Sequence, residues 1–159
     1  MVKDVKISIA EEKDIEDIVN ISHQVAEMHD TALPDYFKPI SKDEEKDNII
    51  ELFKDERITV FKAVCDEKIC GFLFLEMIHR ASKGLQFSKL GCMLNLGVDE
   101  KYRNNGIGTA LLKFAEQYVL EQGGEALDLS VFNFNQKAIK LYERLGYKVI
   151  DVSMRKVLR

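Results

Sequence analysis

Residues 98–111 read Val98-Asp-Glu-Lys-Tyr-Arg103-Asn-Asn-Gly106-Ile-Gly108-Thr-Ala-Leu111. An apolar, strand-like segment runs into a turn that carries one arginine and two glycines, and a helical pattern begins at once. Glycine lets a backbone come close to a ligand, and the first N–H groups of a helix have no partner within the helix. Such a turn attracts an anion, and the fork-shaped guanidinium of Arg103 suits phosphate oxygens. The stretch therefore predicts a strand, a diphosphate-binding turn and a helix in succession.

Two other glycine-rich phosphate loops do not fit this turn. A P-loop ends in Gly-Lys-Ser/Thr, whereas Gly108 is followed by Thr109 and Ala110. The dinucleotide fingerprint needs a third Gly or Ala where this chain has Leu111, and it normally opens a domain. What remains is Arg-x-x-Gly-x-Gly after a strand. Taken alone, this motif leaves open an ordinary strand–turn–helix with a glycine-rich turn.

Length and composition indicate a globular protein. The 159 residues are most simply a single domain over 1–159, and a hydrophobic fraction of 46% with 31% charged residues is typical of soluble proteins. No apolar run is long enough to span a bilayer, and the N-terminus lacks the apolar core of a signal peptide. We therefore expect a cytoplasmic protein with no membrane attachment. The net charge of −4 argues against non-specific nucleic-acid binding.

Charge is unevenly distributed along the chain. Residues 1–60 carry a net charge of −8 and residues 61–159 carry +4. A basic second half suits a polyanionic cofactor and an acidic first half suits a cationic acceptor, although plain surface solvation explains the pattern equally well. The three cysteines, Cys65, Cys70 and Cys92, all lie in strand-like segments. We expect them to be small buried apolar residues and expect no metal site, because no histidine forms a ligand-spaced cluster with them.

The hydrophobic pattern predicts ten elements in the order β-α-α-β-β-β-α-β-α-β. Strands are expected at residues 5–9, 57–65, 69–79, 87–98, 126–132 and 147–158. Helices are expected at residues 14–28, from a capping box at 41–44 to residue 53, at 105–122 and at 135–145, with a proline-punctuated loop at 29–39. Hairpins followed by a β-α-β unit imply an α/β (α+β) fold, with a mixed sheet and helices on both faces.

A second stretch offers a separate test of function. Residues 129–147 read Leu129-Ser-Val-Phe-Asn-Phe-Asn135-Gln-Lys-Ala138-Ile-Lys-Leu-Tyr142-Glu-Arg-Leu-Gly146-Tyr147. Asn135 is placed to cap the short helix that follows it. Tyr142 shares one helix face with apolar neighbours, so its side chain should point toward the sheet. The alternative is that Tyr142 is a core residue with a satisfied hydroxyl.

Together the two stretches resemble the GNAT superfamily of acyl-CoA-dependent N-acetyltransferases. Its signatures are Arg/Gln-x-x-Gly-x-Gly/Ala and, later in the chain, Asn-x-x-Ala-x-x-x-Tyr-x-x-x-Gly-Phe/Tyr, and this sequence matches each named position. The resemblance covers essentially the whole chain. It implies a mostly antiparallel sheet whose strands splay at the CoA site. It also implies an enzyme that moves the acetyl group of acetyl-CoA to a primary amine, on a small molecule or a protein, by direct attack in a ternary complex.

The resemblance also implies roles for particular residues. Pantetheine would lie along the backbone of Leu96, Gly97 and Val98, with an N–H near Leu96 facing the thioester oxygen, although Gly97 is as readily a packing glycine. Tyr142 would protonate the departing thiolate, and Asn135 would hold the cofactor, cap its helix, or both. The diphosphate would bind the backbone amides of the turn, and Arg103 would add positive charge beside them. The residues of this turn are Asn104, Asn105, Gly106, Ile107, Gly108 and Thr109.

The general base is less well defined. Many relatives place a glutamate on the strand before the diphosphate turn, but residues 87–98 contain no acid. By topology Glu76 and His79, on the neighbouring strand, are the nearest substitutes, although a solvated edge residue is the favoured interpretation of each. A water chain, or an acceptor whose pKa is already lowered, stays open. The resemblance places the acceptor between residues 29–39 and 79–84, where a pocket could be formed by Asp30, Asp35, Tyr36 and Phe37.

Three further questions stay open from sequence. A non-catalytic module that binds acyl-CoA is the alternative function, motivated by the missing strand carboxylate. A longer acyl group is a third reading, because the side chains that form the acyl pocket cannot be placed. A homodimer through the C-terminal strand is expected by resemblance, since residues 149–158 alternate in polarity.

Overall fold

The computed structural model describes residues 4–80 and 83–159. Residues 81 and 82, which belong to the stretch 79–84 expected beside the acceptor, and residues 1–3 lie outside the described residues. The strands are β1 (Lys6–Ile9), β2 (Ile58–Cys65), β3 (Lys68–His79), β4 (Lys89–Val98) and β5 (Leu127–Leu129). The helices are α1 (Ile15–Ala32), α2 (Lys42–Lys54), α3 (Ile107–Glu121) and α4 (Gln136–Arg144), with short 3₁₀ turns η1 (Glu12–Asp14) and η2 (Glu100–Tyr102).

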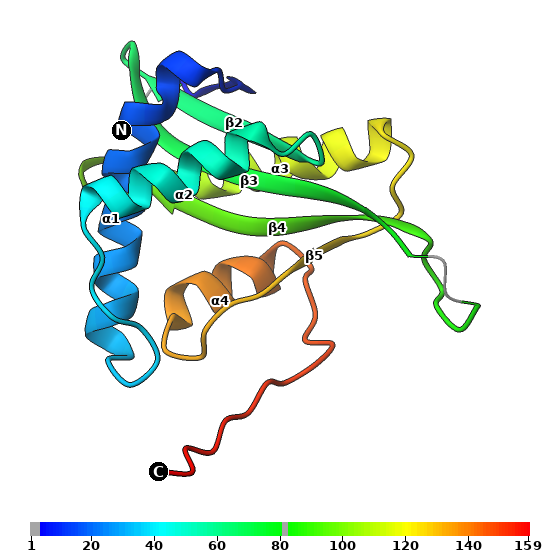
Figure 1. Ribbon diagram of the computed structural model, residues 1–159. Coiled ribbons are helices and arrows are strands. Elements are labelled where there is room, and N and C mark those ends of the chain that lie inside the picture. Colours follow the sequence, from blue (N-terminus) through cyan, green and yellow to red (C-terminus); the bar gives the residue numbers. More distant parts are fainter. Residues whose placement is uncertain (1–3, 81–82) are drawn as a thin grey trace.

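One mixed sheet forms the centre of the fold. Its strands lie in the order β1-β2-β3-β4-β5; neighbours among the first four are antiparallel, and β5 runs parallel to β4. Helices α1 and α2 cover one face, and α3 covers the other (Figure 1). The predicted mixed, mostly antiparallel sheet with helices on both faces is confirmed.

The buried residues of β3 show how the sequence produces these layers. Side chains alternate across a strand, so successive residues enter opposite cores. Phe72 and Phe74 pack with residues of α1 and α2, whereas Leu73 and Leu75 pack with residues of α3. All four are fully buried. A strand buried on both faces reads as a continuous apolar run, as residues 69–75 do.

Strands β4 and β5 separate after three paired residues. Gly91, Cys92 and Met93 pair with residues 127–129, and the pairing stops there. At the same level β4 has a bulge, because Phe74 lies opposite Asn95 and Leu75 opposite Met93, which leaves Leu94 as an extra residue. Beyond this point the two strands diverge and leave a gap in the sheet.

The helix starts follow local signals. The Glu44 N–H donates to Ser41 Oγ at 3.2 Å, and the Ser41 N–H donates to the Glu44 carboxylate at 2.7 Å. This reciprocal pair is the predicted capping box, and it begins α2. Within the ranges that the structure covers, every helix is too short or too polar to traverse a lipid bilayer.

Three element boundaries differ from the prediction. Helix α1 continues to Ala32, so the first part of the predicted loop 29–39 is helical; the helix ends just before Pro34, where the chain can no longer remain helical. Strand β5 is only three residues long, because it leaves β4. The predicted strand 147–158 forms no regular element, and the side chains of Val149, Ile150, Val152 and Met154 are 76–91% exposed. Within the described residues, no strand packs beside it to supply backbone partners.

The sequence analysis missed one feature of the cysteines. Cys65 and Cys70 are fully buried, as expected, but they form a disulfide across the β2–β3 hairpin. Asp66 and Glu67 adopt positive φ in a tight turn, which brings the two Cα atoms to 6.0 Å. Cys92 on β4 is free and half-buried. The expectation of separate small apolar residues is therefore wrong for this pair.

Candidate functional site

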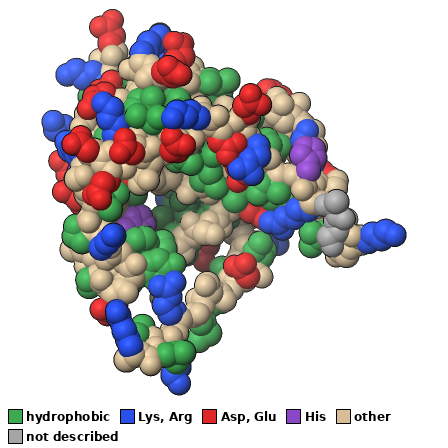
Figure 2. Space-filling view, in the orientation of Figure 1, with side chains coloured by type: hydrophobic (Ala, Val, Ile, Leu, Met, Phe, Trp, Pro, Cys, Tyr) green, Lys and Arg blue, Asp and Glu red, His purple; other side chains and the backbone are tan. Residues whose placement is uncertain are grey.

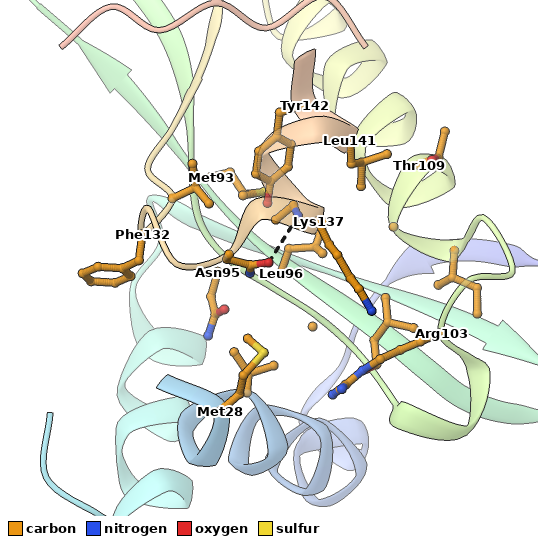
Figure 3. Close-up of a pocket in the computed structure, with 18 of the residues that line it drawn as sticks. Met28, Met93, Asn95, Leu96, Arg103, Thr109, Phe132, Lys137, Leu141 and Tyr142 are labelled. Atoms are coloured by element: carbon orange, nitrogen blue, oxygen red, sulfur yellow. Dashed lines mark hydrogen bonds between the residues drawn. The ribbon is translucent and has the colours of Figure 1, made fainter. Parts of the chain in front are cut away.

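A cleft of about 770 Å³ opens where β4 and β5 diverge. Figure 2 shows the surface hollowed between α1 and α4, while acidic side chains gather over α1 and α2. The cleft is lined by Val25, Met28 and His29 of α1, residues 93–98 of β4, Tyr102–Asn104 and Gly106–Thr109 of the turn, Ser130–Phe132 after β5, and Asn135, Lys137, Ala138, Leu141, Tyr142 and Arg144 of α4 (Figure 3).

The turn before α3 forms one end of this cleft. Gly106 has a φ of 79° and precedes the first residue of α3, a left-handed conformation in which glycine is favoured. No side chain caps this helix, so its first backbone N–H groups are left for water or a ligand. Asn105 does not line the cleft; its side-chain amide donates to the carbonyls of Tyr102 and Arg103, both at 3.1 Å, and this holds the turn in place.

Cationic side chains surround this end of the cleft. Arg103 Nε donates to the Val98 carbonyl at 3.0 Å, which anchors the guanidinium beside the turn. Lys137 points from α4 toward the side of the cleft that carries Arg103 (Figure 3), and Arg144 lines the cleft as well. No Asp or Glu of the described chain lines it. The cleft is therefore suited to a polyanion.

Gly97 on β4 is required by packing. A Cβ at this position would lie 2.5 Å from Cε1 of Phe72 and 3.1 Å from Cγ2 of Val25. Only a residue without a side chain lets β4 pass this close to α1 and to the core of the sheet. The packing alternative for Gly97 thus holds, while its backbone still lines the cleft between Leu96 and Val98.

The hydroxyl of Tyr142 points into the cleft from α4 (Figure 3). The residue is 8% exposed, and burial raises the pKa of its phenol above the ordinary value. A raised pKa keeps the hydroxyl protonated, so it remains a proton donor. Tyr147 packs edge-on against this ring at 5.9 Å and donates to Glu116 on α3 at 2.9 Å, which secures the end of α4. The Asn135 side chain accepts from the Ala138 N–H at 3.2 Å and caps α4.

A model of the acetyltransferase (GNAT) family matches residues 24–147. The chain belongs to the GNAT family. The matched segment includes the turn before α3, the diverging strands β4 and β5, and Tyr142, so it contains every wall of the cleft.

Individual relatives of this GNAT chain agree with that assignment. An N-alpha-acetyltransferase of Sulfurisphaera tokodaii is 32% identical over 107 residues, covering 65% of this chain and 64% of that protein. A mutant of the BH1408 protein from Bacillus halodurans has a TM-score of 0.86 at 25% identity, covering 97% and 99%. An aminoglycoside N-acetyltransferase solved in complex with CoA shares the fold at a TM-score of 0.77 and 15% identity, covering 98% and 95%. The chain spans less than two thirds of the length of the first curated relatives that it matches.

The structure does not bring Glu76 to the cleft of this GNAT protein. Glu76 lies on β3 opposite Cys92, at a level where β4 and β5 are still paired. Its carboxylate forms an ion pair with Arg57 at 3.1 Å. The topological argument that placed it at the reaction gap is corrected, because β4 stands between β3 and the gap. His79 is at the exposed end of β3 and does not line the cleft either.

The sequence analysis missed the α1 wall and an aromatic cluster beside it. Ring centroids of His29 lie 5.4–5.5 Å from those of Phe37, Phe132 and Phe134. Tyr36 adjoins Phe37 and Phe132, and we call these five side chains the aromatic cluster. Four residues of this region were expected to form the acceptor pocket, and none of them lines the cleft: Asp30, Asp35, Tyr36 and Phe37. Tyr36 and Phe37 nevertheless adjoin it, because they contact His29 and Phe132 in the aromatic cluster. The sequence did hold one signal for the position of His29. It follows Val25 by four residues, a spacing that places both side chains on the inner face of α1.

Proposed function

We propose that this GNAT protein is an N-acetyltransferase that moves the acetyl group of acetyl-CoA to a primary amine by direct attack in a ternary complex. The observation that carries the proposal is the cleft itself. It has an uncapped helix start and cations at one end, and the protonated Tyr142 hydroxyl in its wall. We further propose that the chain acts as a single domain in the cytoplasm.

The diphosphate of acetyl-CoA would bind the turn. The N–H groups of Ile107, Gly108 and Thr109 lie in the first turn of α3, which no side chain caps, and an anion is stabilised at this positive end of a helix. A Cβ built on Gly106 meets no atom within 4 Å, so there is open space on that side of the turn. Arg103 and Lys137 would add charge from two sides. The residues present therefore fit a nucleotide diphosphate.

The pantetheine arm would continue along β4. Residues 94–98 lose β5 as a neighbour, so the gap exposes one edge of β4, where pantetheine amides can hydrogen-bond to the backbone. A backbone N–H near Leu96 would donate to the thioester oxygen as negative charge develops on it, an arrangement of the oxyanion-hole type. Tyr142 would then supply a proton to the departing sulfur, a role that is worth about 10²–10⁴-fold in rate.

The experiment has two parts. Isothermal titration with acetyl-CoA tests binding, and thiol release with a panel of primary amines tests transfer. Binding with thiol release that falls strongly in Tyr142→Phe is the expected outcome. The absence of binding would refute the proposal at its first step.

A second candidate function is a non-catalytic module that binds acyl-CoA. The observation that favours it is that no carboxylate of the described residues lines the cleft. Acetyl-CoA binding with equal, near-background thiol release from wild type and Tyr142→Phe would support this candidate. Competition between acetyl-CoA and longer thioesters would show whether the acyl group is longer.

We also propose a homodimer, on the basis of the exposed apolar side chains in residues 149–158. These side chains alternate along an extended segment that has no partner strand in the described chain. Sedimentation equilibrium of the full chain, compared with a variant carrying Ile150→Lys and Val152→Lys, tests this. Two monomeric species would contradict it.

A further inference from the structure

His29 occupies the wall of the cleft opposite the one that carries Tyr142. It lies on the last turn of α1, which covers one face of the sheet, whereas the face of the α4 helix that bears Tyr142 packs with the core on the α3 side. Both side chains line the cleft. The gap between β4 and β5 therefore has a phenol on one side and an imidazole on the other.

The hydrogen bonding of His29 fixes which nitrogen is free. Nδ1 lies 2.7 Å from the Val25 carbonyl oxygen. A carbonyl only accepts, so Nδ1 carries the proton and the lone pair of the neutral ring is on Nε2. In the part of the chain that the structure describes, Nε2 has no hydrogen-bond partner and is not among the buried, unpartnered atoms. The ring is held in place and its basic nitrogen is accessible.

The other described residues that line the cleft offer no comparable base. The charged ones are Arg103, Lys137 and Arg144, which are cationic at neutral pH. The remaining polar ones are amides, hydroxyls and the phenol of Tyr142, which burial keeps protonated. Glu76 lies outside the cleft and is paired with Arg57.

We propose that His29 is the catalytic base that takes the proton from the acceptor amine; this inference rests on the proposed acetyl transfer. An alkylammonium acceptor gives one proton to Nε2 of His29 and becomes a nucleophilic amine. Its nitrogen forms a bond to the thioester carbon as the carbon–sulfur bond breaks, and the sulfur takes the Tyr142 hydroxyl proton. The second amine proton replaces the one lost by Tyr142, and His29 releases its proton to water. The net products are the acetamide, CoA thiol and one proton.

The aromatic cluster defines the class of acceptor. Phe37, Phe132 and Phe134 surround the imidazole with apolar surface, so an acceptor with an aromatic or apolar group next to its amine is favoured. Charged residues that adjoin members of the cluster in sequence are Asp30, Asp35 and Lys38, and the guanidinium of Arg155 lies 4.0 Å from the centre of the Tyr36 ring. A polycationic acceptor is disfavoured, because the cleft presents three cationic side chains.

Two probe amines of different basicity test the role of His29. Benzylamine is protonated at neutral pH and must lose that proton before attack, whereas aniline is already neutral. His29→Phe keeps an aromatic ring in the cluster but has no basic nitrogen, and His29→Gln serves as a second variant if the first folds poorly. His23→Gln is the matched control, because His23 lies on α1 outside the cleft.

We expect both His29 variants to acetylate benzylamine about 10²-fold more slowly than wild type, and aniline within about threefold of wild type. Acetyl-CoA binding and the His23→Gln rates should be unchanged. Equal losses on the two amines, or a benzylamine rate within about threefold of wild type, would overturn the inference. A wild-type protein that binds acetyl-CoA but acetylates neither probe would overturn the inferred acceptor class, whereas no thiol release with any amine of the panel would refute the proposed function and the inference with it.

Discussion

Replacing Gly108 by alanine separates the folding role of the turn from its proposed ligand role. Gly108 lies in the first turn of α3, and its φ is not in the left-handed region. A Cβ there would meet Leu141 Cδ2 at 3.6 Å and Leu96 Cδ2 at 3.8 Å, which are ordinary contacts. Alanine favours a helix over glycine by about 0.8–1.0 kcal/mol in the interior, and somewhat less near an end. Gly108→Ala should therefore raise the free energy of unfolding by about 0.5 kcal/mol.

The same methyl group enters the proposed diphosphate site, because Gly108 lines the cleft. A phosphate that must move away from the N–H groups at the start of α3 loses part of a charge-assisted hydrogen bond, worth about 1.5–3 kcal/mol in full. Losing about half of such a bond weakens binding about three- to twelvefold. The variant should be as stable as wild type or more so, yet bind acetyl-CoA about three- to twelvefold less tightly.

Urea unfolding and isothermal titration on the same preparations measure the two effects. Gly106→Ala is the matched control for the stability measurement. Gly106 has a φ of 79°, which strains alanine, so this variant should be less stable than wild type by about 1 kcal/mol. Wild-type acetyl-CoA affinity in a fully folded Gly108→Ala protein would refute the placement of the diphosphate at this turn.

Three more outcomes follow from the geometry. Tyr142→Phe should bind acetyl-CoA as wild type does but release thiol about 10²-fold more slowly. Because burial raises the pKa of this phenol, a pH–rate profile of the wild type should show no loss of activity at the ordinary tyrosine pKa. Gly97→Ala should cost about 1–3 kcal/mol in urea unfolding, because its Cβ would overlap Phe72, and an unchanged midpoint would contradict this packing. Desolvation is the largest single influence on Asp14 and opposes its ionisation, but the hydrogen bonds donated by Lys62 at 2.6 Å and by the Glu11 N–H at 2.8 Å, with the charge of Lys62, together outweigh it and lower the carboxyl pKa below 3.8. The contribution of Asp14 to stability is therefore present above pH 3.8 and lost as the pH falls further, and Lys62→Met should flatten that acid limb in pH-dependent unfolding.

Features that depend on neighbouring residues in sequence were predictable. The turn at residues 103–108 follows from glycine and helix-start chemistry, and Ser41 and Asn135 cap their helices as expected, because a capping side chain acts within three residues. The apolar runs at 57–65 and 69–79, joined by a short polar turn, correctly predicted the hairpin of β2 and β3. Local rules were sufficient for these elements.

Features that depend on residues distant in sequence were missed. The length of β5 is set by where β4 diverges from it, which no residue of 126–132 signals. The residues 147–158 alternate as a strand does, but a strand forms only with a neighbour. Glu76 was placed by strand order alone, and the order does not show that the gap lies on the far side of β4. His29 lines the site because α1 continues past its predicted end and because Phe132, distant in sequence, packs against the imidazole.

The most direct test is a crystal structure of the protein grown with CoA. We predict diphosphate oxygens within hydrogen-bonding distance of the backbone N–H groups of residues 107–109, with the guanidinium of Arg103 beside them. CoA bound elsewhere, with this turn in contact only with water, would contradict the central claim.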